Sequence, residues 1–414
     1  MYIDLRRIAH IPLIAVLAYF ASGAELFVFQ ATSIPPLWAQ IVGLGLMIAW
    51  IGATAVATNG RALIVSRPIA AVFVALILYA FVTALSFTYS VQNEIVVETL
   101  IARIKAIVFI IVVSLILLDA NFRARFTLAA AALAVFGSIL AVVDFIEPTF
   151  STVPGRGAGF YLNSNEAAMI LVALGLIGSM RLKVVPAYVL WTIISVGVLA
   201  TFSRTGWLLL FLALLAITVE GRLGGGRARY FFLAAVGSLL AGLLAAYLSG
   251  DLYTWINTSS LAEYLDPNTL ARLGARGVAL DDYSATERAD VFWYGLEHFL
   301  KSPFIGWGVG YGNVWQEAVN THNMPLALAV DIGLIGPLFY FGFFTVLIIG
   351  NRGLIRFLSI ILVVGGMSSH NQLEFIADAL IIAFAIASMN DFSRKNAAPA
   401  RQTNFKAPNF GPAT

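Results

Sequence analysis

The sequence has no cysteine and very little charge. Its 414 residues include four His and only 11% Asp, Glu, Lys and Arg, whereas 60% are hydrophobic. Without cysteine, the chain forms no disulfide and offers neither a thiolate nucleophile nor a Cys-ligated metal site. Together with a mean hydropathy of +0.88, the scarcity of charge excludes a soluble globular protein, which needs far more polar surface.

Long apolar runs predict an all-α polytopic membrane protein with about twelve transmembrane helices. A helix rises about 1.5 Å per residue, so runs of roughly 15–26 residues suit a hydrocarbon core of about 30 Å. We place these spans near residues 11–29, 36–57, 69–89, 101–118, 126–146, 165–180, 184–202, 205–219, 231–249, 324–349, 355–369 and 373–390. The first is long enough to cross, so we interpret it as a span and not as a cleaved signal peptide.

We expect one transmembrane domain, residues 1–393, followed by a disordered cytoplasmic tail over 394–414, which is rich in Pro, Asn and Ala. Between the ninth and tenth spans lies a partly helical loop, about residues 250–321. Within it, Ser284 and Glu287 form a capping box, and the apolar residues that follow predict an amphipathic helix lying against the membrane or the bundle. Pro303 ends that helix, and glycines at alternate positions from Gly306 to Gly312 predict a close-packed turn.

The distribution of basic residues suggests a ligand. We assign successive loops to alternating sides of the membrane. Most of the 25 Lys and Arg then fall on one side, together with both termini, and an excess of basic residues marks that side as cytoplasmic. The others lie at outer, periplasmic ends, where topology disfavours them: Arg103, Lys105, Arg156, Arg204, Arg272, Arg276, Arg288 and Lys301. An anionic ligand on the outer side would explain them. The alternatives are pairing with nearby acids and snorkelling to lipid.

Arg204 is the strongest of these candidates, because it lies in a tight turn between two apolar runs. A cation at membrane depth costs roughly 2.5–3.5 kcal/mol on insertion scales. Arg156 lies in a Gly-rich outer loop near Asn165, where an Arg fork suits phosphate and an Asn amide suits sugar hydroxyls. The alternative for this pair is a solvated arginine beside a helix cap.

The other cations have weaker contexts. Arg288 heads the amphipathic helix, whereas Arg272 and Arg276 have acidic neighbours that would pair with them. Arg103 and Lys105 are expected at the outer end of the fourth span, one turn inside it.

His322, followed by Asn323, stands at the outer start of the tenth span. A neutral histidine accepts a proton from a hydroxyl, and a well-placed general base contributes about 10²–10⁴-fold. The alternative is an interfacial histidine that caps a helix. His370 is the second candidate base. Asp281 and Asp282 are neighbours in the long loop and could bind a divalent ion, but paired acids in a loop are more often solvated. We expect neither a metal nor a cofactor.

Several short motifs occur together: Ser203-Arg204-Thr205-Gly206; Arg288 and Trp293 followed by Pro303, Gly306 and Gly308; His322-Asn323 with Gly333 and Gly336; and Gly155-Arg156-Gly157 leading to Asn165. In order and spacing they resemble the O-antigen ligase/polymerase family of bacterial envelope enzymes, over about residues 156–336. The resemblance implies a bundle similar to GT-C-type glycosyltransferases, with a periplasmic cavity.

The resemblance also implies an activity: metal-independent, inverting transfer of a glycan from undecaprenyl diphosphate to an acceptor sugar hydroxyl. On that basis Arg204 and Arg288 would bind the diphosphate, and His322 would act as the base or orient the acceptor. Arg156 and Lys105 would join the donor site, although the residues around Lys105 depart from the family's pattern. Substrate contacts are further expected from Asn165, Arg103, Arg276 and Asn323.

The expected partners are the lipid-linked donor, a glycan or lipid A–core acceptor and membrane lipids, with no nucleic acid, and the expected location is the bacterial inner membrane. Ligation of O-antigen to lipid A–core is our first hypothesis. Polymerisation of O-antigen or exopolysaccharide repeat units is the alternative, because it uses the same donor. A flippase or transporter of lipid-linked oligosaccharide is a third, but it should carry its charges at mid-membrane and not at outer ends.

Overall fold

A computed structural model describes residues 5–60, 63–152, 155–222, 251–259, 283–315 and 321–397, together with Ala234, Ser238 and Gly242. Nearly all of the predicted ninth span lies outside the described residues. So do Arg272, Arg276, Asp281, Asp282 and the tail from residue 398 onward.

The described chain is built from helices, and no β-strand occurs within the described ranges. The α-helices are α1 (Leu5–Ala21), α2 (Ala24–Thr32), α3 (Pro36–Thr58), α4 (Arg67–Ser86), α5 (Glu94–Leu117), α6 (Ala120–Ile146), α7 (Ser164–Ser179), α8 (Val184–Ala200), α9 (Arg204–Val219), α11 (Asp251–Asn257), α13 (Tyr283–Lys301), α14 (Met324–Ile332), α15 (Ile335–Gly350), α16 (Gly353–Gly366) and α17 (Ile376–Ala397). Short 3-10 turns lie at η2 (Phe87–Tyr89), η3 (Gly159–Tyr161) and η5 (Tyr311–Asn313). The all-α prediction is confirmed for the described part of the chain.

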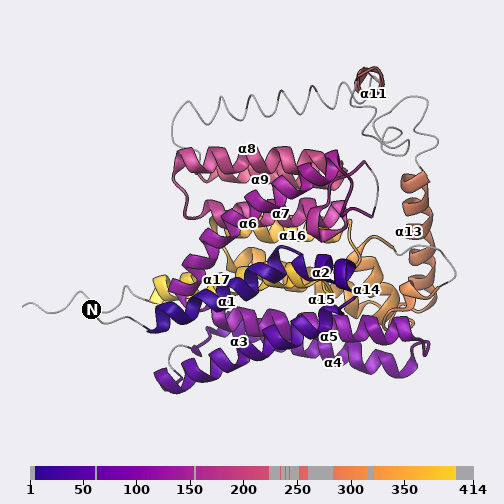
Figure 1. Ribbon diagram of the computed structural model, residues 1–414. Coiled ribbons are helices and arrows are strands. Elements are labelled where there is room, and N and C mark those ends of the chain that lie inside the picture. The colour runs from indigo at the N-terminus through magenta and orange to yellow at the C-terminus, as the bar shows by residue number, and fades with distance from the viewer. Residues whose placement is uncertain are drawn as a thin grey trace, which may run out of the picture.

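Helices α7 and α17 form the centre of the bundle. Every residue of α7 from Glu166 to Ser179 is buried, which explains why its sequence is apolar on all sides. Helix α17 packs on α5, α1 and α7. In Figure 1 the long helices run side by side, whereas α13 lies across one end of them, beside α14.

Several helices are long and apolar enough to cross a membrane. Four meet this description within the described residues: α3, α4 extended by η2, α5 and α6. The bent pair α1 and α2 would be a fifth span, and six further apolar helices are shorter. A 16-residue helix is only about 24 Å long, less than a hydrocarbon core of about 30 Å. A membrane protein is therefore supported, and the total of about twelve spans stays a prediction.

Two predicted spans are interrupted, and glycine marks both breaks. Helix α1 ends at Ala21 and α2 restarts at Ala24 with a 70° bend. Between them Gly23 has φ +72°, and a Cβ there would meet the backbone of Phe160. The predicted tenth span is likewise two helices, because Gly333, at φ +66°, ends α14. The expectation of single continuous helices over 11–29 and 324–349 is wrong.

Other boundaries also differ from the prediction. Helix α5 begins at Glu94, capped by the Asn93 side chain, which accepts a hydrogen bond from Ile95 N at 3.0 Å. Arg103 and Lys105 therefore lie more than two turns inside this helix. Helix α13 begins at Tyr283, one residue before the predicted cap, and the side chains of residues 284–287 are outside the description. Helix α17 continues to Ala397, three residues beyond the predicted start of the tail.

The amphipathic helix α13 has one face on the protein and one face exposed. Val291 packs with Trp315 and Leu326 in a small cluster beside α14. Trp293 and Leu300 on the other face are 64% and 65% exposed. The structure therefore confirms contact with the bundle, and the exposed apolar face suits a membrane interface.

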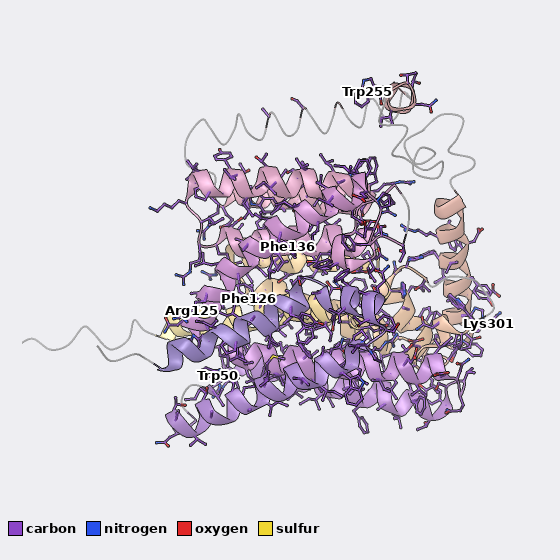
Figure 2. The ribbon with its side chains drawn as sticks, viewed as in Figure 1. Trp50, Arg125, Phe126, Phe136, Trp255 and Lys301 are labelled. Atoms are coloured by element: carbon purple, nitrogen blue, oxygen red, sulfur yellow. The ribbon has the colours of Figure 1, made fainter. Side chains whose placement is uncertain are left out.

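Arg125 and Lys301, one residue from each of the two sets of basic residues, lie at different ends of the bundle. Figure 2 shows Arg125 near one end and Lys301, on α13, at the other. Close to Arg125, the Arg123 side chain donates from Nη1 to the carbonyl oxygens of Leu117 and Ala387, at 3.0 and 3.1 Å. This arrangement agrees with the segregation expected from the sequence.

Candidate active site

The glycine-rich segment after α13 packs tightly against α14. Trp307 N donates to Val330 O and Gly308 N donates to Asp331 O, both at 2.9 Å. Gly306 has φ +75°, and a Cβ on it would overlap the backbone carbonyl of Asp331. The predicted close-packed turn is confirmed, and its glycines permit a backbone approach that no other residue allows.

Arg103 is the centre of a buried ion-pair network. Its Nη1 lies 2.7 Å from Asp331 Oδ2, and its Nε lies 2.8 Å from Glu374 Oε1. The same Asp331 carboxylate accepts hydrogen bonds from Gly310 N and Tyr311 N, both at 3.1 Å. Arg103 is 2% exposed, so it neither snorkels nor ends at the membrane surface as the sequence suggested. It ties α5 to α14, to the glycine-rich turn and to the loop before α17.

His322 lies in the turn that leads into α14. Its backbone is left-handed, with φ +47°, which is rare for a residue with a side chain. The next residue, Asn323, caps α14 by accepting a hydrogen bond from Leu326 N at 3.0 Å. Asn323, predicted to contact substrate, therefore uses its side-chain oxygen to fix the turn. A strained backbone held by an adjacent cap is a common feature of functional positions.

Both candidate histidines meet at this place. The His322 and His370 rings are 5.4 Å apart between centroids, edge to face at 78°. Burial, and then the positive charge of Arg288, lower the pKa of His322 to about 4. Burial also lowers the pKa of His370 to about 4, with contributions from His322 and Arg103. Both imidazoles are therefore neutral at pH 7 and each has a nitrogen able to accept a proton.

A narrow polar cleft lies beside His370 and has a cavity volume of about 10 Å³, enough for about one water molecule. Its lining consists of Arg103, Gly310, Gly312, Asn313, Thr321, Ala327, Asp331, His370 and Glu374. Carboxylate, amide, hydroxyl and imidazole groups of this kind suit sugar hydroxyls, which both donate and accept hydrogen bonds.

Arg204 and Arg288 are held by different elements. Arg204 is the first residue of α9 and is exposed, directly after the cap residue Ser203, whose Oγ accepts a hydrogen bond from Gly206 N at 3.0 Å. Arg288 is half-buried on α13, close enough to His322 to act on it electrostatically. Arg276 lies outside the described residues.

Arg156 and Asn165 bond to each other and to the turn before α9. Arg156 Nη2 donates to Asn165 Oδ1 at 3.0 Å, and its Nε donates to Thr201 O at 3.0 Å. Ser203 Oγ donates to the same Asn165 oxygen at 2.8 Å. Arg156 is 4% exposed. These bonds fix the residue that precedes Arg204, so in this structure the pair supports the turn.

The first turn of α7 connects the two halves of the site. Asn165 bonds to the Arg204 turn, as above, and Glu166 next to it accepts a hydrogen bond from Ser369 Oγ at 2.8 Å. Ser369 directly precedes His370. One helical turn therefore holds both the arginine-bearing turn and the histidine-bearing loop.

Lys105 is half-buried on α5. Its charge interacts with two carboxylates from different parts of the chain, Glu25 of α2 and Glu374. Glu25 is itself buried and accepts a hydrogen bond from Gln40 Nε2 at 2.6 Å. The structure thus places Lys105 near the Arg103 network, and its proposed contact with the donor remains a prediction.

The sequence interpretation missed four acidic residues, because it considered acids only in the long outer loop, as partners of its arginines or as a solvated pair. Asp144, at the end of α6, holds the following loop by accepting hydrogen bonds from five backbone N–H groups of residues 149–159. Asp331, Glu374 and Asp378 were missed as well. All four lie within predicted spans, where an acid is rare and calls for an explanation. In the described ranges no group of three or more His, Asp or Glu is arranged to hold a metal ion.

The chain matches one family model. Residues 188–341 match the family described as O-antigen ligase. The match includes Arg204, Arg288 and His322, and it begins after the Arg156 segment, which had been expected to belong to it. No curated protein matches the chain.

Proposed function

We propose, from the match of residues 188–341 to the O-antigen ligase family, that the protein transfers a glycan from a lipid diphosphate carrier to an acceptor sugar. The donor is undecaprenyl diphosphate-linked polysaccharide, the acceptor is lipid A–core, and the reaction takes place on the periplasmic side of the inner membrane. The observation that carries the proposal is the neutral, half-buried His322, which contacts the ring of His370 and lies within the electrostatic influence of Arg288.

In the proposed reaction, the acceptor hydroxyl oxygen attacks the anomeric carbon from the side opposite the diphosphate. The bond between that carbon and the phosphate oxygen breaks, its electron pair leaves with the diphosphate, and the anomeric configuration inverts. The hydroxyl proton passes to His322. Arg204 and Arg288 stabilise the negative charge that develops on the leaving group, which is the largest contribution in many enzymes.

Donor binding would also prepare the base. A histidine with a pKa of about 4 is a weak base at neutral pH, since the best general bases have a pKa near the working pH. In the free protein, burial and, to a smaller extent, the positive charge of Arg288 lower the pKa of His322, and the diphosphate brings about two negative charges toward Arg288. Compensation of the positive charge raises the pKa of His322 when the donor arrives. His322 therefore becomes a stronger base only in the loaded site.

A deletion strain tests the proposal. Surface polysaccharide and lipid-linked intermediates are separated by gel from the strain without the protein and from the strain complemented with it. A ligase predicts loss of polymer attached to lipid A–core, with long lipid-linked chains accumulating. Core capped by a single repeat unit would instead identify a polymerase, the second candidate. An unchanged surface polysaccharide would contradict both.

A further inference from the structure

Asp144, at the end of α6, has no role in the proposed transfer, yet it is fully buried and both of its carboxylate oxygens accept several hydrogen bonds. Its Oδ1 accepts from three successive backbone N–H groups, those of residues 149–151, at 2.7–3.2 Å. Its Oδ2 accepts from Ala158 N at 2.7 Å and from Gly159 N at 3.1 Å. One side chain thereby ties both ends of the loop of residues 149–159 to the helix.

The loop held by Asp144 carries Arg156 to the far side of α6. The next residue, Gly157, lies directly on that helix, since a Cβ on it would overlap the backbone oxygen of Ala141. Arg156 itself is buried and donates from Nε to Thr201 O at 3.0 Å. Thr201 follows the last residue of α8, so the loop reaches the turn that joins α8 to α9.

This turn needs support, because its backbone is strained. Phe202 has φ +49°, a left-handed conformation that is unfavourable for a bulky side chain and persists only where the surrounding structure holds it. Arg156 bonds to the residue before it, Thr201. The residue after it, Ser203, donates from Oγ to Asn165 Oδ1 at 2.8 Å, and Arg156 Nη2 donates to the same oxygen at 3.0 Å. The strained residue is thus fixed on both sides by groups that bond to Arg156.

A second contact runs from the same end of α6 to the same turn. Phe145, next to Asp144, packs its ring against the ring of Phe202, with centroids 5.4 Å apart. We propose that Asp144 is a positioning residue for the donor site: it fixes the loop that carries Arg156, and this loop holds the turn that leads into Arg204. Arg204 is the first residue of α9, two residues after Phe202, so relaxation of the turn would move it.

The absence of cysteine allows the link from Asp144 to residue 204 to be measured without any substrate. Arg204 is exposed, so a nitroxide attached to Arg204→Cys displaces no buried side chain. The EPR spectrum of the purified full-length protein reports the mobility of this label. We expect the label to be more mobile in Asp144→Asn, because the amide presents N–H donors where the loop needs an acceptor. This measurement does not depend on the proposed function.

The matched control is the carboxylate cap at the other end of α6. Asp119 accepts hydrogen bonds from Asn121 N at 2.8 Å and from Phe122 N at 3.2 Å. Asp119→Asn therefore makes the same chemical change far from the turn and should leave the label's mobility unchanged. An unchanged label in folded Asp144→Asn, or equal increases in Asp144→Asn and Asp119→Asn, would overturn the proposal.

A second variant covers a failure of Asp144→Asn to fold. Arg156→Gln removes the connection between the loop and the turn and leaves the five hydrogen bonds of Asp144 in place. It should also raise the mobility of the label at residue 204, and an unchanged label would again overturn the proposal. Failure of both variants to fold would mean that the loop is needed for the fold as a whole, which contradicts a positioning role.

Binding of a short-chain prenyl diphosphate, measured by calorimetry, tests the consequence for the donor site, and this part rests on the proposed function. We expect Asp144→Asn to bind it about tenfold more weakly than the wild type, the lower end of what a lost charge-assisted hydrogen bond costs. In the Arg204→Ala background the same substitution should have little further effect, because the residue that it positions is gone. Asp119→Asn should bind like the wild type.

The binding outcomes separate this proposal from the proposed function. If Arg204→Ala binds weakly, wild-type binding by Asp144→Asn, or a further tenfold loss in the double variant, would contradict positioning of Arg204 by Asp144. Wild-type binding by Arg204→Ala would instead contradict the proposed role of Arg204 in donor binding. In that case the mobility of the label still decides whether Asp144 positions residue 204.

Discussion

The ring of His322 meets the ring of His370 edge to face, with centroids 5.4 Å apart. Both rings are largely buried, and burial lowers the pKa of each to about 4. Because the protein has only four histidines, NMR of histidine-labelled protein can follow each one. We expect His322 and His370 to stay neutral from pH 7 down to about 5 and to gain a proton near pH 4. His322→Gln should remove one of these two signals, and a normal titration near pH 6.5 would contradict the burial of this pair.

Donor binding should change this titration. A short-chain prenyl diphosphate supplies the charged part of the donor without the glycan. Burial is the larger cause of the low pKa of His322, and the positive charge of Arg288 is the smaller one. If the diphosphate binds at Arg288, it offsets the second cause, so the pKa of His322 should rise above its value in the free protein. The same NMR experiment measures the change. In Arg288→Gln the pKa of His322 should already be higher without the diphosphate, and adding it should have little further effect.

The pairing of Arg103 with Asp331 should contribute strongly to stability. In Asp331→Asn, the buried guanidinium keeps only Glu374, and two backbone N–H groups compete for one oxygen. Removing one partner of a buried pair costs about 3–5 kcal/mol, and the remaining carboxylate puts the expected loss near the lower limit. Thermal unfolding in detergent measures it. Glu297→Gln breaks the exposed pair with Lys301 and should leave the Tm unchanged.

The glycine-rich turn allows a matched comparison. Gly308 has φ +97°, and a Cβ there would lie 2.5 Å from Ser90 Cα, so Gly308→Ala is both strained and crowded. Strain of this kind costs about 1–3 kcal/mol. Gly312 is four residues further on, and a Cβ there would contact nothing within 4 Å. We expect a lower Tm and lower transfer activity for Gly308→Ala, and a nearly wild-type Tm for Gly312→Ala. Equal behaviour of the two variants would argue against close packing of this turn.

The sequence could predict features that depend on local patterns. The apolar runs of α3 and α6, the close-packed turn from Gly306 onward and the segregation of basic residues all follow from periodicity, composition or neighbouring residues. The breaks at Gly23 and Gly333 had a local signal too, since glycine inside an apolar run often marks an irregular backbone. The length of the runs outweighed that signal.

Contacts between distant segments could not be predicted in the same way. Arg103 looked like a membrane-surface cation because its partners, Asp331 and Glu374, are more than 200 residues away in the chain. Their presence within apolar runs was the one available indication, because a buried acid needs a partner, a proton or a function.

Transfer by the purified protein tests the central claim most directly. The wild-type protein, His322→Ala and Arg204→Ala are incubated with undecaprenyl diphosphate-linked polysaccharide and lipid A–core, and the products are separated by gel. We expect polymer attached to lipid A–core with the wild type and a loss of at least about 100-fold in His322→Ala, the range of general-base catalysis. Arg204→Ala should also lose transfer, and both variants should keep the wild-type Tm. Transfer at the wild-type rate by folded His322→Ala would contradict the account.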